Sequence, residues 1–292
     1  MRIAVFSMAV PAALLAMASL AVAQPAGLDG SYDPAEMSDE VKARPQTPGA
    51  IGDQQRHYWF DEAGVEMPYR IYVPENYDPE TPMPLVVALH GYAGDQDYFF
   101  RFARDVPSRS EEHGFIFVAP MGYNYGGWYG LGGPATRGED ATTAEIIRNG
   151  HSVTELSELD VLNVLEIVRE EYSIDADNIF LMGHSMGGAG TWYLGQKYAD
   201  MWAGLAALSG TGNRFFTPDY EELAGTPIHI SVGSEETGSL AGHGEAVAGI
   251  RNAGGRAEFM VVEQGTHGGM IVPVMPVVLD FFSGIATGSE PE

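Results

Sequence analysis

The sequence has 292 residues, no cysteine and a formal net charge of -25 at pH 7, with 40 acidic side chains against 15 lysines and arginines. The lack of cysteine excludes disulfide bridges, zinc–thiolate sites and a cysteine nucleophile. A surface this acidic repels nucleic acid and anionic membranes, so we expect neither as a partner.

Residues 1–23 predict a secretory signal peptide. Arg2 supplies a positive charge, residues 3–22 are apolar, and the small residues Ala21 and Ala23 form a cleavage site before Gln24. A retained membrane anchor is the alternative interpretation. We therefore expect the mature protein to be secreted or periplasmic.

The remaining chain predicts one folded domain behind a short arm. Residues 24–52 are rich in Pro, Gly, Asp and Ser, which is typical of a flexible arm. Residues 53–286 are long enough for one large α/β domain with an ample core, and residues 287–292 form a C-terminal tail.

Strand and helix patterns alternate along this domain. Two strand-like runs, 57–60 and 69–73, flank a turn at 61–64 and predict a hairpin. Further apolar runs predict strands at 85–89, 115–119, 178–182, 205–208, 228–232 and 259–262. Helices are predicted at 158–171 (with Ser157 as its cap), at 189–194, at 245–252 and after Gly269. This alternation predicts a mostly parallel sheet with helices on both faces.

The segment 183–188, Gly-His-Ser-Met-Gly-Gly, lies between a predicted strand and a predicted helix. A serine on such a sharp turn adopts a strained backbone, which small neighbours permit. The turn lifts the hydroxyl clear of the sheet and points the first amides of the helix toward it. The pattern predicts that Ser185 is a nucleophile.

A nucleophilic serine needs a base, and His267 is the strongest candidate among the eight histidines. It follows the last predicted strand, on a glycine-rich loop that leads into the final helix. Reactive groups collect at the carboxyl ends of parallel strands, which favours this position. His243 is the next candidate, although it lies at a predicted helix start. A loop histidine without a role is the alternative.

The acid that orients the base should leave a strand between Ser185 and His267. The strand 228–232 is followed by Gly-Ser-Glu-Glu, so either Glu235 or Glu236 can reach the imidazole. We favour Glu236 over Glu235, and Asp219 is a more distant alternative. The acid would hold the imidazole in the required tautomer and stabilise it once protonated.

The oxyanion of the reaction needs hydrogen-bond donors. Residues 90–94, His-Gly-Tyr-Ala-Gly, follow the strand 85–89, and their glycines let the backbone turn inward. We expect the backbone amides of Tyr92 and Met186 to form the oxyanion hole.

Aromatic side chains follow the strand 115–119 on a glycine-rich segment. Tyr125, Trp128 and Tyr129 are predicted to line a pocket for an apolar or aromatic acyl group. Met270 beside the candidate base would add an adaptable apolar wall. The alternative is that these rings form a hydrophobic clamp for a long loop.

With the segments 89–94, 183–188, 233–236 and 266–269 taken together, the chain resembles the α/β-hydrolase superfamily. It is similar to exported esterases of the feruloyl-esterase and polyhydroxybutyrate-depolymerase type, and to prolyl-oligopeptidase-like hydrolases. The resemblance implies the α/β-hydrolase fold, with a mostly parallel central sheet flanked by helices, and a serine carboxylic-ester hydrolase.

We therefore predict a secreted serine esterase that forms an acyl-enzyme through Ser185, His267 and Glu236. Its substrate would be a small-molecule or polymeric ester, with aryl, hydroxycinnamoyl and polyester compounds as candidates. The mechanism needs no metal and no organic cofactor. A serine peptidase of the prolyl-oligopeptidase type is the alternative enzyme, and a non-catalytic binding protein on the same fold is the alternative outside enzymes.

Overall fold

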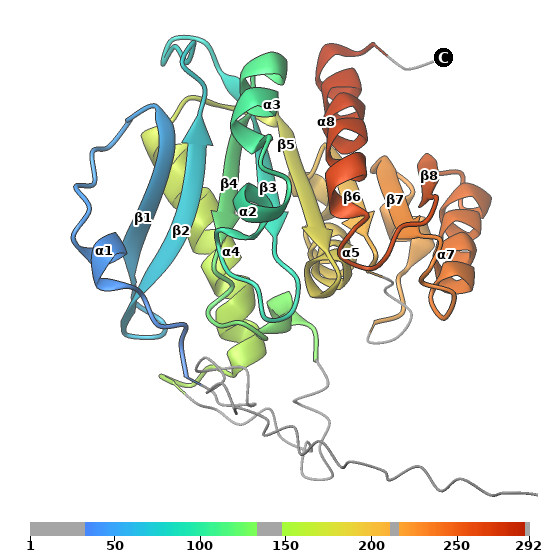
Figure 1. The fold of residues 1–292 in the computed structure, drawn as a ribbon, viewed down its shortest axis with the longest axis horizontal. Coiled ribbons are helices and arrows are strands. Elements are labelled where there is room, and N and C mark those ends of the chain that lie inside the picture. The colour runs from blue at the N-terminus through green and yellow to red at the C-terminus, as the bar shows by residue number, and fades with distance from the viewer. Residues whose placement is uncertain (1–32, 133–147, 211–215, 290–292) are drawn as a thin grey trace, which may run out of the picture.

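A computed structural model of the chain describes residues 33–132, 148–210 and 216–289, and these residues form one eight-stranded sheet (Figure 1). The strands are β1 (Gly52–Phe60), β2 (Val65–Val73), β3 (Met83–Leu89), β4 (Ile116–Pro120), β5 (Ile174–His184), β6 (Gly204–Leu208), β7 (Ile228–Gly233) and β8 (Ala257–Val262). Their order across the sheet is β1-β2-β4-β3-β5-β6-β7-β8. The pairs β1–β2 and β2–β4 are antiparallel, and all neighbouring pairs in the remaining run β4-β3-β5-β6-β7-β8 are parallel. The predicted α/β-hydrolase fold is confirmed.

Helices cover both faces of the sheet (Figure 1). One face packs against α4 (Val153–Glu171), α5 (Met186–Lys197) and α7 (Leu240–Asn252). The other packs against α2 (Tyr98–Phe102), α3 (Val106–His113) and α8 (Ile271–Thr287). Shorter helical turns are α6 (Tyr220–Leu223), η1 (Trp128–Gly130) and η3 (Ala199–Met201).

This double covering explains why the strands are apolar without interruption. Leu85, Val87 and Leu89 of β3 join the core under α4 and α5, because alternate side chains of a strand point to the same face. Val86 and Ala88 point the other way, into the core under α3 and α8. A run that is apolar at every position is therefore the pattern of a central parallel strand.

The start of α4 corrects the helix predicted at 158–171. The helix begins five residues earlier, at Val153, and Ser152 is its cap. The Ser152 hydroxyl accepts from the Glu155 N–H while the Glu155 carboxylate accepts from the Ser152 N–H, so two otherwise unpaired helix donors are satisfied. Ser157 is a buried helical residue instead, and its hydroxyl accepts a hydrogen bond from the Tyr129 N–H.

The described part of the predicted arm contacts the domain. The short helix α1 (Asp39–Lys42) is capped by the Ser38 hydroxyl, and its residue Val41 is buried. Ala35 packs into a small core with Phe60 at the end of β1. The predicted signal peptide lies outside the described residues, and within them no helix is both long and apolar enough to cross a membrane.

Candidate active site

The turn between β5 and α5 places Ser185 in a strained backbone conformation, with φ 57° and ψ -112°. A Cβ atom on Gly183 would lie 2.2 Å from the Gly187 carbonyl oxygen, and one on Gly187 would lie 2.0 Å from the Leu89 carbonyl oxygen. Only glycine fits at these two positions, because the turn packs directly against its own backbone and against the end of β3. The turn is further held by a hydrogen bond of 2.8 Å from the Ser185 N–H to the Leu208 carbonyl.

The structure brings Ser185, His267 and Glu236 into one chain of hydrogen bonds. The Ser185 Oγ lies 2.8 Å from His267 Nε2, and His267 Nδ1 lies 2.5 Å from Glu236 Oε2. A carboxylate only accepts, so Nδ1 carries the proton and the Nε2 lone pair faces the serine hydroxyl. This is the tautomer that a general base for Ser185 requires.

The Glu236 carboxylate is held in its ionised form. Burial opposes its charge, but hydrogen bonds from His267, from the Ser209 hydroxyl and from the Gly233 N–H outweigh burial and lower its pKa to about 2. The Ser209 and Gly233 donors both reach Oε1, at 2.6 and 3.0 Å, which leaves Oε2 to His267. Glu236 is therefore a fixed acceptor for the imidazole.

The alternative residues lie elsewhere. Glu235 is exposed, and its backbone N–H donates to the Gly265 carbonyl. The Asp219 carboxylate caps α6 by accepting from the N–H groups of Glu221 and Glu222. His243 is buried in α7, where Nδ1 lies 2.8 Å from the Ser239 carbonyl oxygen. The alternative acids, Glu235 and Asp219, and the alternative base, His243, therefore do not belong to the chain of hydrogen bonds.

The loop after β3 lies against the serine turn. A Cβ atom on Gly91 would lie 3.3 Å from His184 Nδ1, so the loop backbone runs directly beside the residue before Ser185. The Gly94 N–H donates to the Gly91 carbonyl at 2.9 Å and closes the loop. Tyr92 lies between these glycines, with half of its surface exposed. Met186 is the first residue of α5, so its amide belongs to the helix end that has no partner within the helix.

The aromatic segment after β4 supports this loop. Tyr129 is fully buried, and its hydroxyl donates to the His90 carbonyl at 3.2 Å. His90 Nε2 lies 2.6 Å from the Met121 carbonyl oxygen, and the Ala93 N–H donates to the Tyr125 carbonyl at 2.9 Å. Three contacts therefore fasten the loop after β3 to the segment after β4.

The burial of Tyr129 and Met270 contradicts their predicted place in the acyl pocket. Tyr129 and Met270 expose none of their surface, so a substrate has no access to either side chain. Tyr129 supports the neighbouring loop, and Met270 packs in the core beneath α8. Trp128 is also buried, with 8% of its surface exposed, whereas Tyr125 is partly exposed. Tyr129 therefore fits the alternative interpretation, in which the ring is buried and holds a loop in place.

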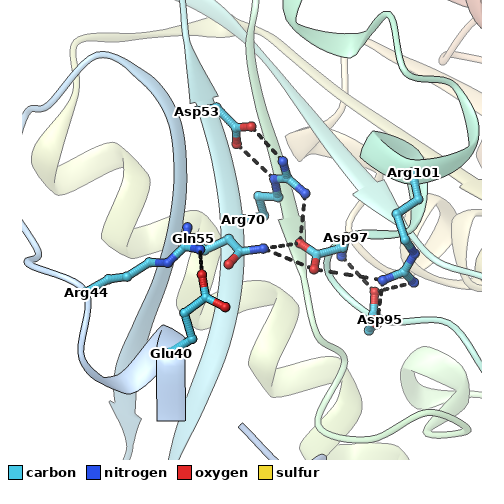
Figure 2. Close-up of polar contacts among 8 residues, drawn as sticks. All are labelled: Glu40, Arg44, Asp53, Gln55, Arg70, Asp95, Asp97 and Arg101. Atoms are coloured by element: carbon cyan, nitrogen blue, oxygen red, sulfur yellow. Dashed lines mark hydrogen bonds and ion pairs between the residues drawn. The ribbon is translucent and has the colours of Figure 1, made fainter. Parts of the chain in front are cut away.

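Ion pairs anchor the segment 95–101, which follows the loop after β3 (Figure 2). Arg70 on β2 binds Asp53 of β1 at 2.6 Å and Asp97, at the start of α2, at 3.0 Å. Arg101 of α2 reaches back to Asp95 at 2.7 Å. The Arg70 side chain is only 18% exposed, so this network is less screened by solvent than a surface pair. It fastens the segment 95–101 to the β1–β2 hairpin.

Two residues of the site were not predicted from the sequence. Ser209 follows β6 directly and bonds to Glu236, and its place at the carboxyl end of a parallel strand was a usable signal. His184 bonds to the His267 backbone, 83 residues away, and no local pattern indicates that contact. Among the described residues, no cluster of three or more His, Asp or Glu side chains forms a metal site.

Residues 61–247 match the sequence profile of the esterase family. The chain belongs to this esterase family. The matched residues include Ser185 and Glu236, and they extend from the β1–β2 turn into α7.

Several proteins that are named as esterases resemble the chain over parts of its length. Feruloyl esterase B of Neurospora crassa is 28% identical over 145 residues, which cover 50% of this chain and 44% of that protein. This chain thus spans less than half the length of that curated relative. The structure of a ferulic acid esterase from Anaeromyces mucronatus, in complex with ferulic acid, superposes with a TM-score of 0.60 at 14% identity, covering 85% of this chain and 97% of that one. A thermostable esterase gives a TM-score of 0.62 at 22% identity, with coverage of 79% and 62%. At these low sequence identities, the structural similarity shows that this chain shares the fold of the two esterases.

The two neighbouring glutamates provide a matched test of the hydrogen-bond chain. We expect Glu236→Gln to lower kcat for an aryl ester about 10³- to 10⁴-fold, because the imidazole loses the acceptor that fixes its tautomer. Glu235→Gln removes an exposed charge one residue away and should leave kcat within about twofold. Steady-state hydrolysis of a p-nitrophenyl ester measures both variants. Equal losses in the two variants would contradict the assignment of Glu236.

Stability against pH tests the lowered pKa of Glu236. A carboxylate whose pKa falls from 4.5 to about 2 on folding stabilises the native state above pH 4.5, and this contribution is lost as the pH falls toward 2. The difference in free energy of unfolding between the native sequence and Glu236→Gln should therefore shrink over that range. Urea denaturation at a series of pH values measures it. The corresponding difference for Glu235→Gln serves as the control, and a parallel decline in both would refute the prediction.

Proposed function

We propose that this protein is an exported serine esterase that cleaves carboxylic esters through an acyl-enzyme. The observation that carries the proposal is the hydrogen-bond chain from Ser185 through His267 to Glu236, with distances of 2.8 and 2.5 Å. It lies at the carboxyl edge of the parallel sheet, on three different loops. Membership of the esterase family supports the same reaction class.

In the first half of the reaction, the Ser185 Oγ attacks the ester carbonyl carbon while its proton passes to His267 Nε2. Glu236 accepts the Nδ1–H and stabilises the imidazolium that forms. The backbone N–H groups of Met186 and Tyr92 donate to the oxyanion. The alcohol oxygen takes the proton from His267 as the C–O bond breaks, and the acyl group stays on Ser185.

In the second half, water takes the place of the alcohol. It attacks the acyl carbon as its proton passes to His267 Nε2, and that proton then returns to the Ser185 Oγ as the acyl–enzyme bond breaks. The carboxylic acid leaves and the free enzyme is restored. No step needs a metal ion or an organic cofactor.

Two observations support the choice of substrate class. The His267 side chain is 52% exposed, so the reacting groups are open to a bulky ester on this side. The related proteins named above include feruloyl esterases. We propose hydroxycinnamoyl esters and other aryl esters first, with polyesters as the second class. The pattern of residues 1–23 supports export from the cytoplasm.

Covalent labelling tests the nucleophile directly. A fluorophosphonate probe should label the folded protein, and Ser185→Ala should abolish the label because the probe bonds to an activated serine oxygen. Ser108→Ala on the exposed face of α3 is the control and should label like the native protein. Labelling that survives in Ser185→Ala, or its absence in folded native protein, would overturn the proposal.

The same preparations separate the substrate classes. We expect measurable kcat/KM for a p-nitrophenyl ester and for methyl ferulate, and none above the Ser185→Ala background for a peptide anilide. Polyester particles, with released acid as the readout, form the fourth arm. If a peptide anilide were cleaved faster than both esters, the protein would be a serine peptidase rather than an esterase.

A further inference from the structure

His184 occupies the last position of β5, directly before Ser185, and only 1% of its surface is exposed. Its ring does not turn toward the serine hydroxyl. Instead, Nε2 lies 2.7 Å from the backbone carbonyl oxygen of His267, and Nδ1 lies 2.7 Å from the Tyr98 hydroxyl. The Tyr98 ring also stacks on the imidazole, with 21° between the planes.

The two partners determine where the proton of this imidazole lies. A carbonyl oxygen only accepts, so Nε2 carries the hydrogen and donates it to His267. Nδ1 then has a free lone pair, which accepts the hydrogen of the Tyr98 hydroxyl. Burial and the nearby His267 lower the pKa of His184 to about 4, and burial raises the pKa of Tyr98 to about 12. Both groups therefore stay neutral between these values, and the direction of each hydrogen bond is fixed.

These contacts connect three segments that carry the proposed reaction. Tyr98 begins α2, four residues after the loop that holds Tyr92. His184 belongs to the serine turn, and the accepting carbonyl belongs to His267 itself. One buried imidazole thus connects the segment that carries the proposed oxyanion donor Tyr92 with the proposed nucleophile and the proposed base.

The residues on both sides of His267 are held to neighbouring elements. Just before it, the Gln264 N–H bonds to the Ser234 hydroxyl and the Gly265 carbonyl accepts from the Glu235 N–H. On either side of it, the Thr266 carbonyl accepts from the Met270 N–H at 3.1 Å and the Gly268 carbonyl accepts from the Ile271 N–H at 3.4 Å, while the His267 side chain itself is half exposed. The hydrogen bond from His184 acts on the His267 carbonyl itself and ties the main chain of this residue to the serine turn.

We propose that His184 is a positioning residue: its neutral imidazole, held by Tyr98, fixes the His267 main chain at the distance from Ser185 that proton transfer requires. The inference rests on the proposed function of Ser185 and His267. Its consequence is kinetic. Without the Nε2–H donor, the His267 loop shifts relative to the serine, and a displacement of about 1 Å at a reacting group costs about a hundredfold in rate.

Substitutions at His184 separate the hydrogen bond from simple space filling. His184→Leu fills part of the site without a donor, whereas the amide of His184→Gln places an N–H near the position of Nε2. We expect kcat for a p-nitrophenyl ester to fall about ten- to a hundredfold in His184→Leu with KM within about twofold. His184→Gln should restore most of that loss. Tyr98→Phe, which keeps the stacked ring, should show a smaller loss.

Controls for folding, for the loss of an imidazole and for the proposed function accompany these variants. Circular dichroism and thermal unfolding establish that each variant folds. His113, a partly buried histidine where α3 meets α8, provides the control, because His113→Gln reports the cost of losing an imidazole away from the site. The fluorophosphonate reaction rate of the native protein tests the proposed function separately. If the native protein reacts and folded His184→Leu reacts equally fast with unchanged kcat, the positioning role is refuted. It is also refuted if His184→Gln is no better than His184→Leu. If the native protein itself does not react, the proposed function fails instead.

Discussion

The site depends on one close approach between backbones. The start of α5 packs so tightly against the end of β3 that no side chain fits at Gly187, where a Cβ atom would lie 2.0 Å from the Leu89 carbonyl oxygen. This packing fixes the tight turn in which Ser185 takes its positive φ, and the turn stands at the carboxyl edge of the sheet. The same approach brings the loop after β3 beside His184. The proposed nucleophile and the proposed oxyanion donors are thus placed by the packing of the sheet and α5 rather than by flexible side chains.

Around that turn, polar contacts hold each loop to a neighbour. Ser209 and the Gly233 N–H orient Glu236, Tyr129 supports the loop after β3, and Arg70 ties the following segment to the hairpin. The Arg70 network is notable in a chain with a net charge of -25, because its aspartates are each shared with an arginine rather than left to repel one another. The proposed catalytic groups are therefore held by contacts within the domain before substrate arrives.

The sequence predicted most features that depend on local pattern or chain order, although the cap of α4 is Ser152 and not Ser157. Continuous apolar runs such as 85–89 identify central strands because both faces of the sheet are covered. The order of Ser185, Glu236 and His267 could be read from which strand each follows. Features that depend on distant contacts could not be predicted this way. Glycine-rich aromatic segments look alike whether a ring lines a pocket or lies buried as Tyr129 does, and the contact from His184 to His267 spans 83 residues.

The most direct measurement is a crystal structure of the protein after reaction with a fluorophosphonate, whose tetrahedral phosphorus imitates the intermediate of ester cleavage. We expect a bond between phosphorus and the Ser185 Oγ. The phosphoryl oxygen should lie about 2.7–3.1 Å from the backbone nitrogens of Met186 and Tyr92, with His267 still bonded to Glu236. Phosphorus on another residue, or a phosphoryl oxygen turned away from both amides, would contradict it.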